Sequence, residues 1–118
     1  MTKATKLIGK YGEDRACEYL LTQGYQILDR NFQTTDGELD IVGMIGGSLV
    51  FIEVKTRTSY SAGSPLEAIT HQKLSRQRKL AAIWCSKRHV SNVQVRFDAI
   101  GVLVIRGRVT IEHLKQVI

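Results

Sequence analysis

Residues 37–55, with the sequence GELDIVGMIGGSLVFIEVK, decide the fold, because they read as two short apolar strands joined by a Gly-Gly reversal. Side chains of a strand alternate between its two faces, so we expect Glu38 and Asp40 to share one face of the first strand. The same rule places Glu53 and Lys55 on one face of the second strand. Because an isolated charge is costly to bury, charged residues inside such apolar strands indicate a functional site.

The apolar residues of this hairpin follow from the same alternation. The opposite face should be lined by Leu39, Ile41, Val50, Ile52 and Val54. Leu49 and Phe51 share the face of Glu53, which favours a covered rather than an open sheet face. The alternative is a solvated salt-bridge cluster of Asp40, Glu53 and Lys55 across an exposed pair of strands.

Helical patterns lie on both sides of the hairpin in the sequence. Residues 3–23 have a helical pattern that ends at a glycine, and a capping box that begins at Ser64 predicts a second helix over 65–89. Further strands are expected over 25–31, 93–105 and 108–112. The order α-β-β-β-α-β-β predicts an α/β fold in which helices flank a central mixed sheet.

Length and composition narrow the class of protein. The 118 residues fit one domain, 1–118. The 17 basic and 11 acidic residues give a net charge of +6, which favours a polyanionic partner, with DNA or RNA ahead of an anionic membrane surface. The N-terminal stretch lacks a signal-peptide pattern and the longest apolar run, Ala99–Ile105, has seven residues, so we expect no membrane span and a cytoplasmic protein. Cys17 and Cys85 lack the paired spacing of zinc or redox sites.

Asp40 and Glu53 are expected on adjacent strands, where their carboxylates would converge. Together with a backbone carbonyl such as that of Val54, they would form the hard oxygen site that Mg²⁺ or Mn²⁺ prefers. Lys55 lies about 7 Å beyond Glu53 on the same face, where its ammonium group would orient or deprotonate water or neutralise a phosphate oxygen. Glu13 shares the apolar face of the first helix, and an inward carboxylate needs a partner that a metal site would supply.

At these residues the chain resembles the restriction-endonuclease-like, or PD-(D/E)xK, nuclease superfamily. It is more closely similar to the YraN-type family, which itself looks like archaeal Holliday-junction resolvases. The matching stretches, which extend over nearly the whole chain, are Gly12-Glu13 with Ala16, Asn31-Phe32, Gly37–Val42, Val50–Arg57, Lys73 and Arg96-Phe97-Asp98. Leu39-Asp40 stands where the superfamily's name has Pro-Asp.

The resemblance implies a restriction-endonuclease-like three-layer fold and assigns roles to four residues. Asp40 and Glu53 would be metal ligands for Mg²⁺ or Mn²⁺. Lys55 would be the catalytic lysine, and Glu13 an auxiliary catalytic acid.

Basic residues of the second helix indicate how a phosphate backbone would be held. Lys73 and Arg76 interrupt an apolar stripe formed by Ile69, Leu80, Ile83 and Trp84. Between residues 65 and 89 there are six Lys or Arg and one Glu, a density typical of phosphate binding, with a solvated helix of snorkelling side chains as the alternative. We therefore predict nucleic-acid contacts at Arg57, Lys73 and Arg76. Tyr60, in an expected loop over 56–64, is a candidate for stacking on a base.

Other polar residues carry weaker signals. His71, His89 and His113 lack a mutual metal-ligand spacing and are expected at the surface. Asp98 follows Arg96 at same-face spacing, which fits an ion pair within the strand or a role in the site.

The leading hypothesis is a divalent-metal-dependent endonuclease that hydrolyses DNA phosphodiester bonds by water attack, with branched or structured DNA as a candidate substrate. DNA is favoured over RNA, and a homodimer is expected because cleavage of a junction takes two cuts. The alternative is a nucleic-acid-binding module that keeps the nuclease scaffold without catalytic activity. A third hypothesis is a protein–protein adaptor whose acidic residues are structural.

Overall fold

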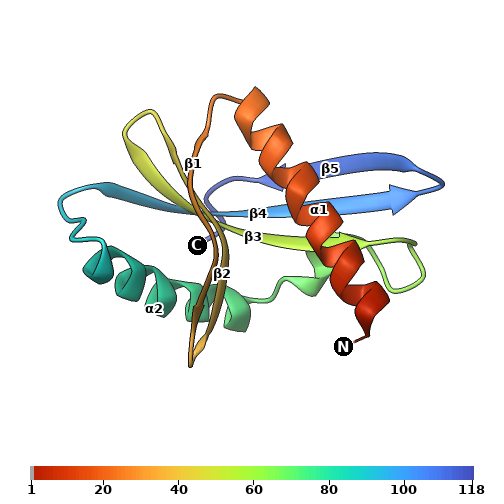
Figure 1. Cartoon of the computed structure of the whole chain (residues 1–118), viewed down its shortest axis with the longest axis horizontal. Coiled ribbons are helices and arrows are strands. Elements are labelled where there is room, and N and C mark those ends of the chain that lie inside the picture. Colours follow the sequence, from red (N-terminus) through yellow and green to blue (C-terminus); the bar gives the residue numbers. More distant parts are fainter. Residues whose placement is uncertain (1) are drawn as a thin grey trace.

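The computed structural model describes residues 2–118 and has a five-stranded mixed sheet with a helix on each side (Figure 1). The elements are α1 (Lys3–Thr22), β1 (Gln26–Thr34), β2 (Gly37–Ile45), β3 (Ser48–Arg57), the 3-10 helix η1 (Pro65–Ala68), α2 (His71–Lys87), β4 (Gln94–Ile105) and β5 (Arg108–Leu114). The strands lie in the order β1-β2-β3-β4-β5, and only the β3–β4 pair is parallel. The predicted α/β class and the order α-β-β-β-α-β-β are confirmed.

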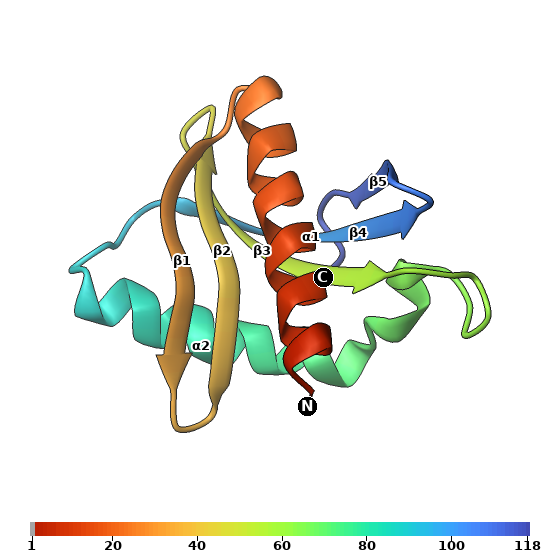
Figure 2. The ribbon, with the colours of Figure 1, turned by 45° about the vertical axis from the view of Figure 1, so that its right-hand side comes forward.

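Each helix covers its own face of the sheet, so the protein has two apolar layers (Figure 2). The layer under α1 contains Ala16, Cys17, Leu20, Ile41, Val50, Ile52, Ile100 and Val102. The layer under α2 contains Leu39, Val42, Leu49, Phe51, Leu80, Ala81 and Trp84. A strand buried on both faces must be apolar at successive positions, which explains the run from Leu49 to Ile52 in β3. Within residues 2–118, no helix combines the length and the apolar character of a membrane span.

The single helix predicted over 65–89 is wrong, because the segment forms η1 and α2 with a break between them. Ile69 and Thr70 are extended there, with ψ angles of 111° and 162°. The Thr70 hydroxyl accepts a hydrogen bond from the Lys73 N–H at 3.2 Å. Thr70 is thus a second N-cap, which starts a new helix instead of continuing the first.

The predicted alternation along β2 is also wrong at one point. Leu39 belongs to the layer under α2, whereas Ile41 belongs to the layer under α1, although regular pleating puts residues two apart on one face. The β1–β2 ladder pairs Arg30 with Ile41 and Phe32 with Leu39, but does not pair the residues between. Those residues are Asn31, whose φ of 54° is left-handed, and Asp40. Both strands therefore change face at the position of the predicted metal ligand.

Gly12 of helix α1 lies close against Thr56 of β3. A Cβ atom at Gly12 would lie 1.8 Å from Oγ1 and 2.7 Å from Cβ of Thr56, whereas a Cβ at Gly9 would meet nothing within 4 Å. The glycine therefore allows the contact that fixes the height of the neighbouring Glu13 above the sheet.

We expect Gly12→Ala to destabilise the protein by about 1–3 kcal/mol, because the added methyl group overpacks the α1–β3 contact. The matched control is Gly9→Ala in the same helix, which should be neutral or up to about 1 kcal/mol more stable because alanine is the better helix former. Urea unfolding of both variants measures the difference. Equal midpoints for the two would contradict the close contact.

Candidate functional site

The site lies where β2 and β3 separate. The β2–β3 ladder ends at the pair Ile41 and Ile52, and the register continued by one step places Asp40 opposite Glu53. Beyond the ladder the Val54 N–H donates to Oδ2 of Asp40 at 2.8 Å. The carboxylate thus replaces a strand partner for this backbone group, which must be satisfied, and is held toward β3 as a result. The structure brings the two predicted carboxylates onto adjacent positions of neighbouring strands.

The electrostatics of this pair are unfavourable in the protein alone. Burial, followed by the charge of Glu53, raises the pKa of Asp40 to about 8. Burial also raises the pKa of Glu53, against the opposing charges of Lys73, Lys55 and Arg76. Within residues 2–118, neither carboxylate lies in an ion pair. The alternative of a solvated salt-bridge cluster is therefore wrong, because these acids are half-buried and carry no cationic partner.

A cavity of about 470 Å³ opens beside Asp40, between α1 and the ends of β2 and β3. Glu13, Asp40 and Lys55, three of the four predicted catalytic residues, line it, whereas Glu53 does not. The other lining residues are Thr5, Lys6, Ile8, Gly9, Lys10, Asn31, Glu38, Val54 and Thr56. Lys6 and Lys10 bring positive charge to the rim, and the sequence alone gave no reason to place them there.

Glu13 is buried as predicted, but its partners come from β1. Its Oε1 accepts hydrogen bonds from Nε and Nη2 of Arg30 at 3.1 and 3.0 Å and from Nδ2 of Asn31 at 3.0 Å. Burial raises the pKa of Glu13, and Arg30 opposes this effect. Glu13 thus has the partner that an inward carboxylate was expected to need, and that partner is the pair Arg30 and Asn31. Asn31 is the residue with a left-handed φ, a conformation that Asn tolerates better than most residues.

The predicted basic residues lie on two sides of the carboxylates. Lys73 and Arg76 are exposed on α2, near enough to Glu53 to lower its pKa. Arg57 is half-buried and lines a groove of about 320 Å³ that shares Thr5, Ile8, Lys55 and Thr56 with the larger cavity. Its Nε is buried and has no hydrogen-bond partner among residues 2–118. Cationic side chains thus lie on both sides of Asp40 and Glu53.

The donor set near Asp40 is small but suits a hard divalent cation. Within residues 2–118, no three His, Cys, Asp or Glu side chains gather into a metal-binding group, so the protein ligands would be Asp40, Glu53 and a backbone carbonyl such as that of Val54. Mg²⁺ commonly binds through one or two carboxylates and keeps several of its waters. Asp40 and Glu53 meet that description, because both are half-buried with raised pKa values, the charge of Glu53 adds to the raised pKa of Asp40, and neither has an ion-pair partner within residues 2–118.

A separate polar network ties the other end of β4 to α1 and β5. The carboxylate of Asp98 accepts two hydrogen bonds from Arg96 at 2.9 Å, one from Nε2 of His113 at 2.7 Å and one from the Gln116 N–H at 3.0 Å. The ion-pair interpretation of Arg96 and Asp98 is confirmed. His71 and His89 are exposed as predicted, but His113 is not, because its side chain is only 4% exposed and also contacts the Tyr19 hydroxyl.

Comparison with known proteins identifies relatives along the whole chain. The model of a family described as "Uncharacterised protein family UPF0102" matches residues 12–102. A UPF0102 protein of Beutenbergia cavernae is 44% identical over 116 residues, covering 98% of this chain and 98% of the relative. A UPF0102 protein of Pelobacter propionicus is 47% identical over 109 residues, covering 90% of this chain and 78% of the relative. A third, from Trichlorobacter lovleyi, is 43% identical over 114 residues, covering 95% and 90%.

Proposed function

This chain belongs to the UPF0102 family, which confirms its predicted resemblance to the YraN-type family. From the geometry of its carboxylates we propose that it is a divalent-metal-dependent endonuclease acting on DNA. The observation that carries the proposal is the pair Asp40 and Glu53. Two half-buried acids on neighbouring strands, with no ion-pair partner within residues 2–118, are costly to maintain unless a cation joins them. Perturbed carboxylates beside a cavity are typical of functional sites.

Each residue of the site has a definite task in this proposal. Asp40, oriented by the Val54 N–H, and Glu53 would hold Mg²⁺ or Mn²⁺. The bound ion would supply activation of water and offset of charge on the phosphodiester. Lys55, which lines the same cavity, neutralises a phosphate oxygen or orients the attacking water. Within residues 2–118, Glu13 accepts its hydrogen bonds at Oε1, which leaves Oε2 available to a water in the cavity.

DNA is the proposed partner because cationic side chains lie on both sides of the carboxylates. Lys6 lies on the α1 side of the cavity, Arg57 lies in the adjoining groove, and Lys73 lies on α2. Phosphate contacts of this kind give affinity without sequence specificity and make binding sensitive to salt. Branched DNA remains the candidate substrate, with junction cleavage by a pair of copies.

The test is cleavage of a panel of labelled DNAs by purified protein. Four-way junctions, single strands and blunt duplexes are incubated with Mg²⁺, Mn²⁺ or EDTA. We expect metal-dependent cleavage of at least one substrate by the wild type and none by the Asp40→Asn, Glu53→Gln double variant. Asp36→Asn removes an exposed carboxylate from the β1–β2 turn and is the matched control.

Two results would replace the proposal with its alternatives. Salt-sensitive DNA binding with no cleavage of any substrate would favour a binding module on a nuclease scaffold. Calorimetry that detects neither Mn²⁺ nor DNA binding would favour the adaptor. Equal cleavage by the wild type and the double variant would place any activity outside the carboxylate site.

A further inference from the structure

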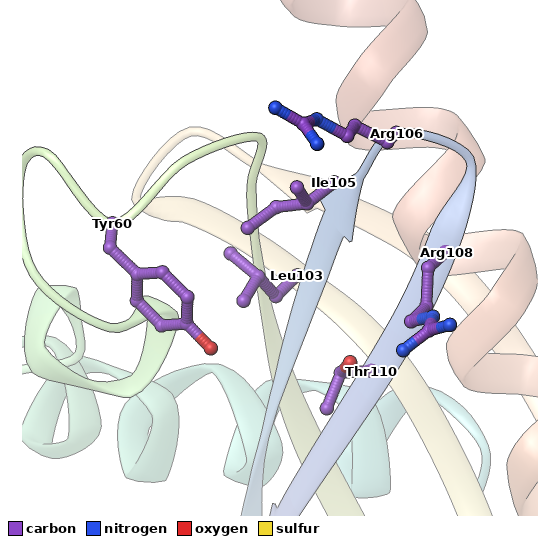
Figure 3. A pocket seen from close by; sticks show the side chains of 6 residues that line it. All are labelled: Tyr60, Leu103, Ile105, Arg106, Arg108 and Thr110. Carbon is purple, nitrogen blue, oxygen red and sulfur yellow. The ribbon is translucent and has the colours of Figure 1, made fainter.

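A second cavity, of about 440 Å³, lies at the tip of the β4–β5 hairpin, apart from the carboxylates (Figure 3). It is lined by Tyr60, Leu103, Ile105, Arg106, Arg108 and Thr110. Tyr60 extends from the loop after β3 and faces the hairpin, and its side chain is exposed, at 65% for the residue. Within residues 2–118, Arg106 and Arg108 form no salt bridge. The cavity therefore combines an open aromatic ring, an apolar wall and two available guanidinium groups.

The strand register relates this cavity to β3, the strand that carries Glu53 and Lys55. In the parallel β3–β4 pair, Arg57 lies beside Leu103 and Lys55 beside Gly101, and in the antiparallel β4–β5 pair Leu103 lies beside Thr110. Neighbours in register share a face of the sheet, so Leu103 and Thr110 continue the face that bears Lys55 and Arg57. Arg57 is about 13 Å along the strand from Glu53, at ~3.3 Å per residue. The 440 Å³ cavity thus lies on the sheet face that bears Glu53 and Lys55, whereas the cavity beside Asp40 opens toward α1.

The hairpin turn places an arginine beside this cavity. Arg106 and Gly107 have φ angles of 50° and 76°, the two left-handed positions of a type I′ turn. The first of these positions favours Asn, Asp or Gly, so arginine is an uncommon residue there. The turn itself accounts for the backbone conformation of Arg106, and its side chain adds a guanidinium group to the lining of the cavity.

We propose that this cavity binds one unpaired nucleotide of the DNA strand held at the carboxylate site, with its base stacked on Tyr60 and its phosphates bound by Arg106 and Arg108. The inference rests on the proposed function, because it takes nucleic acid as the substrate. The base would fill the space between the phenol ring and the apolar wall of Leu103 and Ile105. The volume fits the scale of small-ligand cavities, about 300–1,000 Å³.

The nucleotide is unpaired because stacking needs a free face of the base. In a duplex both faces are covered by neighbouring pairs, whereas single strands, tails and branch points expose them. The inference therefore names the substrate class of the proposed nuclease as DNA with a single-stranded segment next to the scissile bond.

Binding measured in EDTA tests this inference without any contribution from cleavage. The probe is a DNA hairpin with a short single-stranded tail that carries 2-aminopurine at successive positions, compared with the same hairpin without a tail. Wild-type protein should quench 2-aminopurine at one position of the tail. Tyr60→Leu should abolish that quenching and weaken tail binding about 5- to 100-fold, while Tyr60→Phe keeps both because the ring remains.

Arginine variants test the phosphate contacts. Arg106→Asn places a favoured residue in the turn, so it should fold at least as well as the wild type while binding the tailed DNA more weakly and with a smaller salt dependence. Tyr11→Ala removes another exposed tyrosine, on α1, and Arg78→Ala removes an equal charge from α2. These two controls should keep the tail preference. Because each arginine variant removes one positive charge, Arg106→Asn and Arg78→Ala should weaken binding to blunt duplex by a similar, small factor.

The outcomes separate this inference from the proposed chemistry. Tail binding that depends on Tyr60, without metal-dependent cleavage, supports the nucleotide site and removes the nuclease. Metal-dependent cleavage with equal tail affinity for the wild type and Tyr60→Leu overturns the nucleotide site and keeps the nuclease. Absence of tail binding by the wild type also overturns it.

Discussion

Asp40→Asn is expected to give a protein that has lost cleavage and yet unfolds at a higher temperature than the wild type. Cleavage should fall by about a thousandfold or more, because removal of a charged metal ligand forfeits several kcal/mol of transition-state stabilisation. The fold should be preserved, because the Asn side chain still offers an oxygen to the Val54 N–H.

The gain in stability follows from the sign of the pKa shift. The pKa of Asp40 is raised from its usual value near 3.8 to about 8 in the folded protein. The stability linked to the protonated form is complete below the unfolded pKa and is lost as pH rises toward the folded pKa. Metal-free wild type should therefore lose stability between about pH 4 and pH 8, and Asp40→Asn should escape this loss by about 1–4 kcal/mol at pH 8.

Thermal unfolding in EDTA at pH 5 and pH 8 measures the effect. The advantage of Asp40→Asn over the wild type should be large at pH 8 and small at pH 5. Addition of Mn²⁺ should raise the melting temperature of the wild type and leave that of the variant unchanged, because a ligand stabilises only the form that binds it. Asp36→Asn should match the wild type in every condition. A variant less stable than the wild type at pH 8 would show that Asp40 has a structural task instead.

The hairpin and the order of elements could be predicted because their signals are local. A Gly-Gly turn and a capping box at Ser64 each act over a few positions and were found at their expected places, whereas the alternation of apolar residues held in β3 and failed in β2 at Asp40. The break at Thr70 was missed because a threonine inside a helical pattern is either an interior residue or a cap. Only the packing of α2 against the sheet decides between them.

The candidate site was harder to predict because it depends on irregularities in the strands. Asp40 and Glu53 were found from their residue types, but the change of face at Asn31 and Asp40 requires coordinated irregularity in two strands. The partners of Glu13 and the burial of His113 depend on contacts between residues 17 and 94 positions apart in the chain. Pairings at such separations have no periodic signal in a single sequence.

Asp98→Asn should have the opposite profile to Asp40→Asn, with lower stability and preserved cleavage. The Asp98 side chain is fully buried and accepts hydrogen bonds from Arg96, His113 and the Gln116 N–H. Loss of its charge leaves the Arg96 guanidinium without a counterion, and breaking a buried pair in this way costs about 3–5 kcal/mol. The matched control is Glu18→Gln, which breaks the exposed pair with Arg15 and should cost less than about 1 kcal/mol.

The pH dependence of unfolding provides an independent measure of the same carboxylate. Burial alone would raise the pKa of Asp98, but the hydrogen bonds from His113, Arg96 and the Gln116 N–H hold it at about 2. Its contribution is present above the unfolded pKa near 3.8 and is lost as pH falls toward 2, at a cost of about 2.5 kcal/mol. Urea unfolding between pH 5 and pH 2 should show this loss in the wild type and not in Asp98→Asn.

Asp98 and Asp40 differ in what surrounds their carboxylates, and this difference separates structure from function. Asp98 is surrounded by donors and carries its charge at every pH near neutrality, so its removal weakens the protein. Asp40 lies near the charge of Glu53 and has no ion-pair partner within residues 2–118, so its charge is a cost to the fold that binding of a metal would offset. Cleavage normalised to folded protein should survive in Asp98→Asn and vanish in Asp40→Asn. Loss of cleavage in both variants at equal folded fraction would extend the catalytic site to the Asp98 network.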